Sequence, residues 1–135
     1  MNRLLDGVHI LIVEDDEDNR ELLSFALRDS GAKVTTARSA AEVRALLETA
    51  LPDLIVSDLS LPGEDGCAMM ASLRANPATA KVPAIALTGY TESSYLVRAV
   101  KAGFAQLITK PVDLPDLLGP IASLVGRGLP TRGRA

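Results

Sequence analysis

Polar side chains with the chemistry to bind a cation or a phosphate follow four apolar runs of the sequence. Three carboxylates come directly after the first run, and single residues end or follow the others; these residues are Glu14, Asp15, Asp16, Asp58, Thr88 and Lys110. In a parallel sheet, ligands bind beyond the carboxyl ends of the strands. If the apolar runs are such strands, we expect these side chains to lie together.

Carboxylates that are gathered in one place need a compensating positive charge. At ~4 Å, two of them repel by about 4 kcal/mol at an effective dielectric constant of about 20. Mg²⁺ (or Mn²⁺) fits best, because a hard cation accepts carboxylates together with water and a phosphate. Lys110 adds a second positive charge for phosphoryl oxygens, and a carboxylate is able to form an aspartyl phosphate as the nucleophile. The residue types therefore indicate phosphoryl transfer through an aspartate.

The elements that must position these residues alternate along the chain. Short runs rich in β-branched residues predict strands, and longer stretches with helical apolar spacing predict helices. The expected strands are Val8–Val13, Lys33–Thr36, Asp53–Ser57, Ala84–Leu87 and Ala105–Thr109. The expected helices are Glu17–Ser30, a helix that follows the N-cap Ser39, Cys67–Ala75, Thr91–Ala102 and Leu114–Val125. Five strand–helix repeats predict an α/β domain with a doubly wound parallel sheet, covered on both faces.

Composition and charge exclude several classes of protein. The 135 residues are 47% hydrophobic and 23% charged, which suits one folded domain. The net charge of −3 argues against direct DNA binding. The single cysteine, Cys67, cannot form an internal disulfide, and no apolar run reaches the roughly 18 residues of a membrane span. The first residues lack the pattern of a signal peptide. We therefore expect a cytoplasmic protein without membrane contact.

Four motifs, taken together, resemble the receiver domain of response regulators in two-component signalling. They are ILIVEDDEDNR at Ile10–Arg20, DLIVSDLSLPGEDG at Asp53–Gly66, ALTGY at Ala86–Tyr90 and TKP at Thr109–Pro111. Each motif alone carries little weight, whereas four in the right order, at family-like spacing from Val8 to Val125, form a specific signal. The resemblance implies a flavodoxin-like receiver fold with five helices and the strand order 2-1-3-4-5.

The resemblance also implies a role for each residue of the predicted site. Asp58 is expected to accept the phosphoryl group. Glu14 and Asp15 match the acidic pair that binds Mg²⁺ with Asp58, and Ser60 is expected to add its backbone carbonyl. Thr88 and Lys110 match the hydroxyl and the lysine that contact the phosphoryl group, and the peptide bond after Lys110 is usually cis in this family. Asp16 is expected to belong to the start of the next helix.

One position departs from the pattern of the family. Many receivers carry Tyr or Phe three residues before the lysine, where the side-chain rotamer is coupled to the threonine. Leu107 stands at that place here. We expect the phosphorylation chemistry to survive and the output to run through backbone and loop movement. The departure also keeps open a second hypothesis, a receiver-like interaction module that is not phosphorylated.

A third hypothesis is an Mg²⁺-dependent phosphatase or phosphotransferase that acts on small molecules through an aspartyl nucleophile. That chemistry needs a second acid two residues after the nucleophile, where Ser60 stands. It also usually needs a cap domain, for which 135 residues leave no room. We therefore expect a phosphoacceptor regulator, not an enzyme, that assists its own phosphorylation and dephosphorylation.

The expected organisation is a receiver domain at residues 1–126 and a flexible tail at residues 127–135. The phosphoryl group is expected to come from a histidine kinase or a histidine phosphotransfer protein. Because nothing after Val125 resembles an output domain, we expect output by contact with another protein, whose identity the sequence does not reveal. The sequence of Ala86–Val112 also resembles receivers of hybrid histidine kinases, so a stand-alone regulator and an excised piece of such a kinase both stay open. A homodimer stays open as well, because the resemblance implies a family in which dimers are common.

Overall fold

The computed structural model describes residues 4–89 and 93–126. The strands are β1 (His9–Val13), β2 (Lys33–Ala37), β3 (Leu54–Asp58), β4 (Ala84–Thr88) and β5 (Gln106–Thr109). The helices are α1 (Glu17–Asp29), α2 (Ala40–Leu47), α3 (Gly66–Ala75), α4 (Ser93–Ala102) and α5 (Leu114–Leu124). These bounds agree with the predicted ones to within one residue, apart from the start of α4. The predicted start of that helix at Thr91 lies outside the described residues, as does the predicted tail at residues 127–135.

All five strands are parallel and form one sheet in the order β2-β1-β3-β4-β5. The predicted order is therefore confirmed. The register places Val13 opposite Ser57, and Asp58 opposite Leu87. The strands consequently end at nearly the same level, and the residues that end or follow them share one edge of the sheet.

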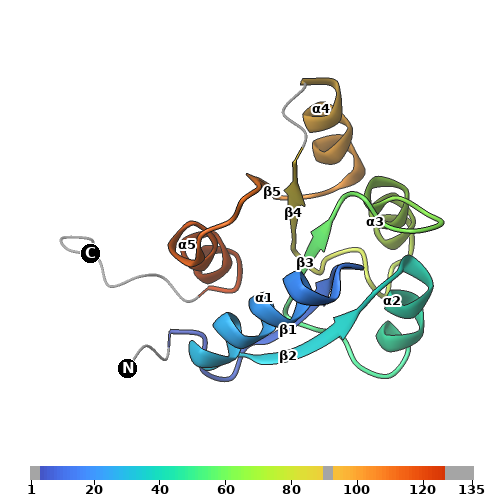
Figure 1. Ribbon diagram of the computed structural model, residues 1–135. Coiled ribbons are helices and arrows are strands. Elements are labelled where there is room, and N and C mark those ends of the chain that lie inside the picture. The colour runs from blue at the N-terminus through green and yellow to red at the C-terminus, as the bar shows by residue number, and fades with distance from the viewer. Residues whose placement is uncertain (1–3, 90–92, 127–135) are drawn as a thin grey trace, which may run out of the picture.

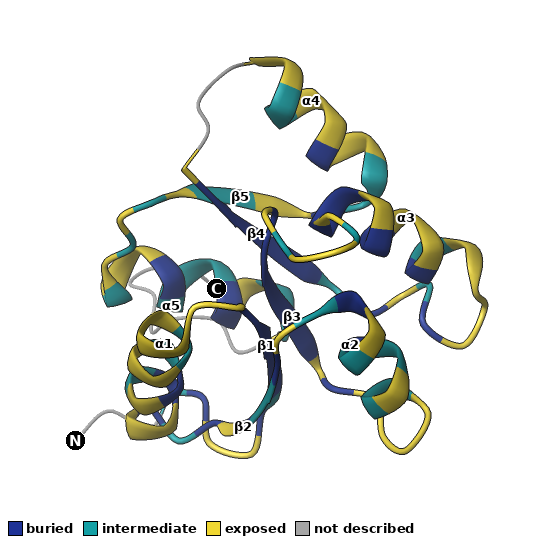
Figure 2. Ribbon diagram, turned by 45° about the vertical axis from the view of Figure 1, so that its right-hand side comes forward, coloured by how far each residue is buried: buried dark blue, intermediate teal, exposed yellow. Residues whose placement is uncertain are grey.

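Helices cover both faces of the sheet, as Figure 1 shows: α1 and α5 lie on one side, and α2, α3 and α4 on the other. Each face has its own apolar core. Leu27, Leu117 and Ile121 belong to the core under α1 and α5, and Val43, Met69 and Ala99 belong to the opposite core. Strands β3 and β4 are buried along their whole length (Figure 2). This covering of both faces explains why the two strands are mostly apolar, with Leu54–Val56 in β3 and Ala84–Leu87 in β4.

The starts of three helices are fixed by side chains that the sequence places there. Asp16 caps α1 by accepting the amide of Asn19 at 2.8 Å, and Ser39 caps α2 by accepting the amide of Glu42 at 3.2 Å. Asp65 caps α3 in the same way. Such caps satisfy amides that have no partner inside the helix. No helix within residues 4–89 and 93–126 combines the length and the apolar character needed to cross a membrane.

Candidate functional site

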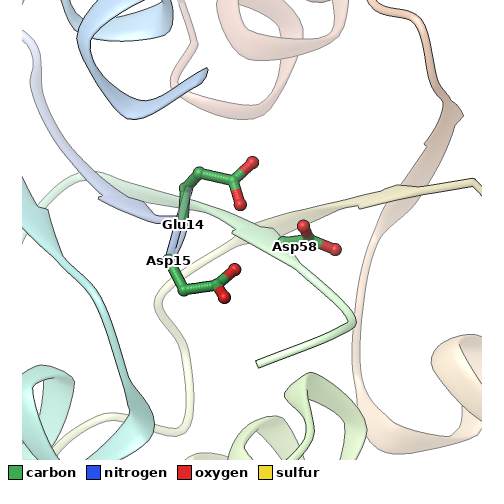
Figure 3. A group of neighbouring side chains, drawn as sticks. All are labelled: Glu14, Asp15 and Asp58. Atoms are coloured by element: carbon green, nitrogen blue, oxygen red, sulfur yellow. The ribbon is translucent and has the colours of Figure 1, made fainter. Parts of the chain in front are cut away.

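Three carboxylates converge at the carboxyl ends of β1 and β3. Glu14 and Asp15 directly follow β1, and Asp58 is the last residue of β3. One oxygen of each side chain lies within 4.8 Å of an oxygen of the other two. Figure 3 shows the side chains of Glu14 and Asp15 pointing toward that of Asp58. Glu14 and Asp58 are buried, whereas Asp15 is exposed to solvent. The structure therefore brings together the three acids that the sequence singled out.

Lys110 supplies the positive charge of this cluster from the end of β5. Its Nζ donates to Oδ2 of Asp58 at 2.6 Å and to Oε1 of Glu14 at 3.4 Å. Burial disfavours the charged ammonium, but the hydrogen bond to Asp58 and the charges of Asp58 and Glu14 outweigh that cost and raise the pKa of Lys110. The ammonium is therefore held charged beside both carboxylates. The peptide bond between Lys110 and Pro111 is cis, as expected.

Glu14 is the carboxyl group whose ionisation the site opposes. Burial and the neighbouring charge of Asp58 raise its pKa from 4.5 to about 6, although the ammonium of Lys110 acts in the opposite direction. The acidic pair after β1 thus has one buried member with a raised pKa and one exposed member, Asp15. A cation bound between these carboxylates would favour the ionised form of Glu14.

Both carboxylate oxygens of Asp58 have a hydrogen-bond donor. The amide of Ser60 donates to Oδ1 at 2.9 Å, and Lys110 donates to Oδ2. The backbone carbonyl of Asp58 lies against the first residue of α3, since a Cβ built on Gly66 would be 2.7 Å from this oxygen. The side chain of Asp58 is therefore oriented on both sides, and the start of α3 is packed directly on its backbone.

Thr88 ends β4 beside this cluster and has only 1% of its surface exposed. Its backbone carbonyl accepts the amide of Lys110 at 2.8 Å, which ties the ends of β4 and β5 together. Leu107 lies three residues before Lys110 on β5, is half-buried, and packs against the core that α2, α3 and α4 cover. The position where many receivers carry an aromatic ring is thus filled by an aliphatic side chain.

Two residues near the cluster received no role from the sequence. Arg20 donates to the backbone carbonyls of Glu14 at 3.0 Å and Asp15 at 3.4 Å, and so braces the turn after β1. Gly66 was placed in a motif, but its close approach to Asp58 was not predicted. The available signal for Arg20 was its place at the end of the motif Ile10–Arg20. The contact of Gly66 with Asp58 depends on packing, which no local sequence pattern encodes.

The residues at this edge fit a divalent cation. Three carboxylates and one ammonium leave two negative charges uncompensated when all are ionised. Carboxylate oxygens are the ligands that Mg²⁺ and Mn²⁺ prefer, and Mg²⁺ is usually bound by one or two carboxylates with water and phosphate. The side chain of Asp16 caps α1 and is not among the three converging carboxylates, whereas its backbone amide donates to Oε2 of Glu14 at 3.4 Å.

The strand order and the acidic edge define a doubly wound α/β domain with a candidate cation site, and the comparisons with known proteins name its family. The sequence model described as "Response regulator receiver domain" matches residues 10–122. The chain belongs to this family, as the resemblance predicted.

The chain is similar to proteins from bacteria. It is 45% identical over 114 residues to an uncharacterized 14.6 kDa protein of Leptolyngbya boryana, which covers 84% of this chain and 87% of that protein. It is 34% identical over 121 residues to the phosphate regulon transcriptional regulatory protein PhoB of Rhizobium meliloti, covering 90% of this chain and 53% of PhoB. The chain thus spans about half the length of that longer relative.

A solved structure agrees with the fold over nearly all of its own length. The receiver domain of the sensor histidine kinase PA1611 from Pseudomonas aeruginosa superposes with a TM-score of 0.83 at 28% identity, covering 89% of this chain and 98% of that one. That structure has a magnesium ion coordinated in its active-site cleft. The flavodoxin-like receiver fold predicted from the sequence is therefore confirmed.

Proposed function

We propose that this receiver accepts a phosphoryl group on Asp58 from the phosphohistidine of a histidine kinase or a histidine phosphotransfer protein. The observation that carries the proposal is the setting of Asp58, whose two oxygens accept from Lys110 and from the Ser60 amide beside Glu14 and Asp15. A buried carboxylate held in this way is oriented for attack without reorganisation of the site.

In the proposed step, a carboxylate oxygen of Asp58 attacks the phosphorus atom of the donor. The new O–P bond forms as the P–N bond to the donor imidazole breaks, and the imidazole takes up a proton as it leaves. The product is an aspartyl phosphate. Lys110 contacts Oδ2 of Asp58 before the reaction and is close enough to pair with phosphoryl oxygens afterwards. The Thr88 hydroxyl would donate a hydrogen bond to a phosphoryl oxygen of this group.

Glu14, Asp15 and Asp58 would hold Mg²⁺ (or Mn²⁺), together with the backbone carbonyl of Ser60. When bound, the ion neutralises negative charge on the carboxylates and the phosphoryl oxygens. The support is the approach of the three carboxylates to one another and the charge that Lys110 leaves uncompensated. The magnesium ion in the similar PA1611 receiver supports the same assignment.

The face of α1 beside the cluster suits the donor protein. Leu22 and Phe25, three residues apart on this helix, are 68% and 72% exposed. An open pocket of about 430 Å³ leads from Leu22 to Glu14 and Lys110. We propose that the donor protein binds this face and that the transfer takes place in the cytoplasm.

The downstream target, or a second copy in a homodimer, would contact α4, where Val97 and Val100 are 49% and 59% exposed.

Incubation with acetyl phosphate and Mg²⁺ tests the proposal. Intact-mass analysis should show one acid-labile phosphoryl group on the wild-type chain and none on Asp58→Asn. A similar receiver that is labelled under the same conditions serves as the positive control. An unmodified wild-type mass would favour the receiver-like module that is not phosphorylated, whereas labelling of Asp58→Asn would show that another residue accepts the phosphoryl group.

A further inference from the structure

The loop between β3 and α3 is hydrogen-bonded to an arginine side chain of the neighbouring helix α2. We call residues 59–65 the phosphoacceptor loop, since they follow Asp58. Arg44 of α2 donates to both carboxylate oxygens of Glu64 in this loop, from Nη1 at 2.8 Å and from Nη2 at 2.7 Å. Its Nη2 also donates to the hydroxyl of Ser72 on α3 at 2.7 Å. One guanidinium therefore joins α2, the phosphoacceptor loop and α3.

This arrangement differs from the other ion pairs on the described surface. The guanidinium of Arg98 contacts Asp65 through a single pair of atoms at 3.2 Å. The guanidinium of Arg38 contacts Glu42 through a single pair at 3.3 Å, and the second oxygen of Glu42 accepts the backbone amide of Arg38. Two parallel hydrogen bonds from a planar guanidinium fix the direction of a carboxylate as well as its distance. The hydrogen bonds from Arg44, more than its charge, also hold the pKa of Glu64 below its usual value. The pair is consequently a geometric restraint on the loop.

The restraint acts on the outer part of the loop, whose backbone hydrogen bond, from the Glu64 amide to the carbonyl of Pro62 at 3.0 Å, stays within the loop. Near the two ends of the loop, the Ser60 amide donates to Asp58 and the Gly66 amide donates to the carbonyl of Leu59. Between them the chain turns through Gly63, which has a φ of +83°. Glu64 follows this turn, so Arg44 ties the outer part of the loop to the body of the protein.

We propose that Arg44 is a positioning residue for metal binding: by holding Glu64, it orders the loop that presents the backbone carbonyl of Ser60. This inference rests on the proposed function, because it assigns Ser60 to the metal site. An ordered loop has less conformational entropy to lose when the cation binds. Loss of the restraint should weaken Mg²⁺ binding and leave the saturated site intact.

Calorimetric titration of Mg²⁺ into the full chain tests the inference. We expect Arg44→Met and Glu64→Gln to raise the Kd of Mg²⁺ about three- to tenfold, the range set by ordering one backbone residue and by a partly exposed ion pair. Arg44→Lys should bind Mg²⁺ more tightly than Arg44→Met and less tightly than the wild type, because lysine keeps the positive charge but cannot make two parallel hydrogen bonds to one carboxylate. Arg38→Met removes an arginine from a surface ion pair outside the loop and should bind Mg²⁺ as the wild type does.

The labelling rate with acetyl phosphate separates positioning from a general structural role. At saturating Mg²⁺, the folded variants should reach the wild-type rate, and at low Mg²⁺ they should lag behind it. A wild-type Kd in Glu64→Gln overturns the inference even if Arg44→Met does not fold, because Glu64 is partly exposed on the loop. A rate that stays low at saturating Mg²⁺ overturns it too. If the wild type itself neither binds Mg²⁺ nor is labelled, the proposed function fails first, and this inference falls with it.

Discussion

Glu14 combines two properties at the scale of a single residue. It is buried, with 2% of its surface exposed, and it lies beside both the carboxylate of Asp58 and the ammonium of Lys110. Its pKa of about 6 means that, without a cation, the folded protein binds a proton there more tightly than the unfolded chain does. The acid that is expected to help bind a metal is thus a source of instability in the metal-free protein.

The stability of the metal-free protein should therefore fall as the pH rises through the window set by Glu14. Between pH 4.5 and about 6 the folded state holds more protons than the unfolded state, so the free energy of unfolding decreases with pH. The raised pKa of Glu14 corresponds to a decrease of at most ~2 kcal/mol in the free energy of unfolding, and this decrease is complete above pH 6. Urea unfolding in EDTA at pH 5 and pH 7 measures this loss.

Glu14→Gln provides the control for this pH dependence. The variant should lack the part of the slope that comes from Glu14, and it should be more stable than the wild type at pH 7 in EDTA. Added Mg²⁺ should reverse that order, because a bound cation favours the charged carboxylate. Equal slopes for the two proteins would contradict the assignment of the raised pKa to Glu14.

At the scale of elements, the junction of β3 and α3 places a helix start directly on Asp58. A Cβ on Gly66 would meet the carbonyl of Asp58 at 2.7 Å and Cα of Leu59 at 2.9 Å. Both of these atoms belong to the backbone and cannot move aside as the end of a flexible side chain would. The position of α3 and the conformation of the phosphoacceptor loop are therefore coupled.

Gly66→Ala should displace this junction. We expect a loss of about 1–3 kcal/mol in the free energy of unfolding, as for other insertions into close-packed regions. Slower labelling by acetyl phosphate should accompany it, since the backbone of Asp58 must shift. Chemical denaturation and the labelling rate measure the two effects.

Gly119→Ala is the matched control, because a Cβ at that position in α5 would meet nothing within 4 Å. Alanine in a helix interior is favoured over glycine by about 0.5–1 kcal/mol, so this variant should be slightly more stable and label normally. A Gly66→Ala variant with the stability and labelling rate of Gly119→Ala would show that the junction of β3 and α3 accommodates a Cβ without loss of stability.

The strands and helices were predictable from the apolar pattern, and the order of the strands in the sheet was predictable from the family resemblance. Together they predicted which residues lie near Asp58. Alternating apolar runs and helical stretches indicated a parallel sheet, whose carboxyl edge gathers the residues that follow each strand. The contact of Arg44 with Glu64 was not predictable in this way. These residues are twenty positions apart, on a helix and a loop, and no periodicity links them. Likewise, Gly66 is the last residue of one of the motifs, but only the packing shows which backbone atoms a Cβ at this position would meet.

At the scale of the whole molecule, the edge of the sheet that carries Asp58 and the exposed apolar side chains of α1 lie on one surface. Leu22 lines the pocket that reaches Glu14 and Lys110, and Phe25 lies one turn further along the helix. Large apolar side chains this exposed are typical of sites where proteins meet. A protein donor needs such a surface, whereas a small phosphodonor needs only access to Asp58.

Leu22→Ala and Phe25→Ala should therefore separate the two kinds of donor. We expect phosphotransfer from a phosphorylated histidine phosphotransfer protein that labels the wild type to slow on the order of tenfold, as for central apolar residues of interfaces. Labelling by acetyl phosphate should not change. Leu51→Ala is the control, because Leu51 is 50% exposed but precedes β3, at the opposite edge of the sheet from Asp58. Equal slowing by the Leu51 variant, or no slowing by either α1 variant, would place the donor on another face.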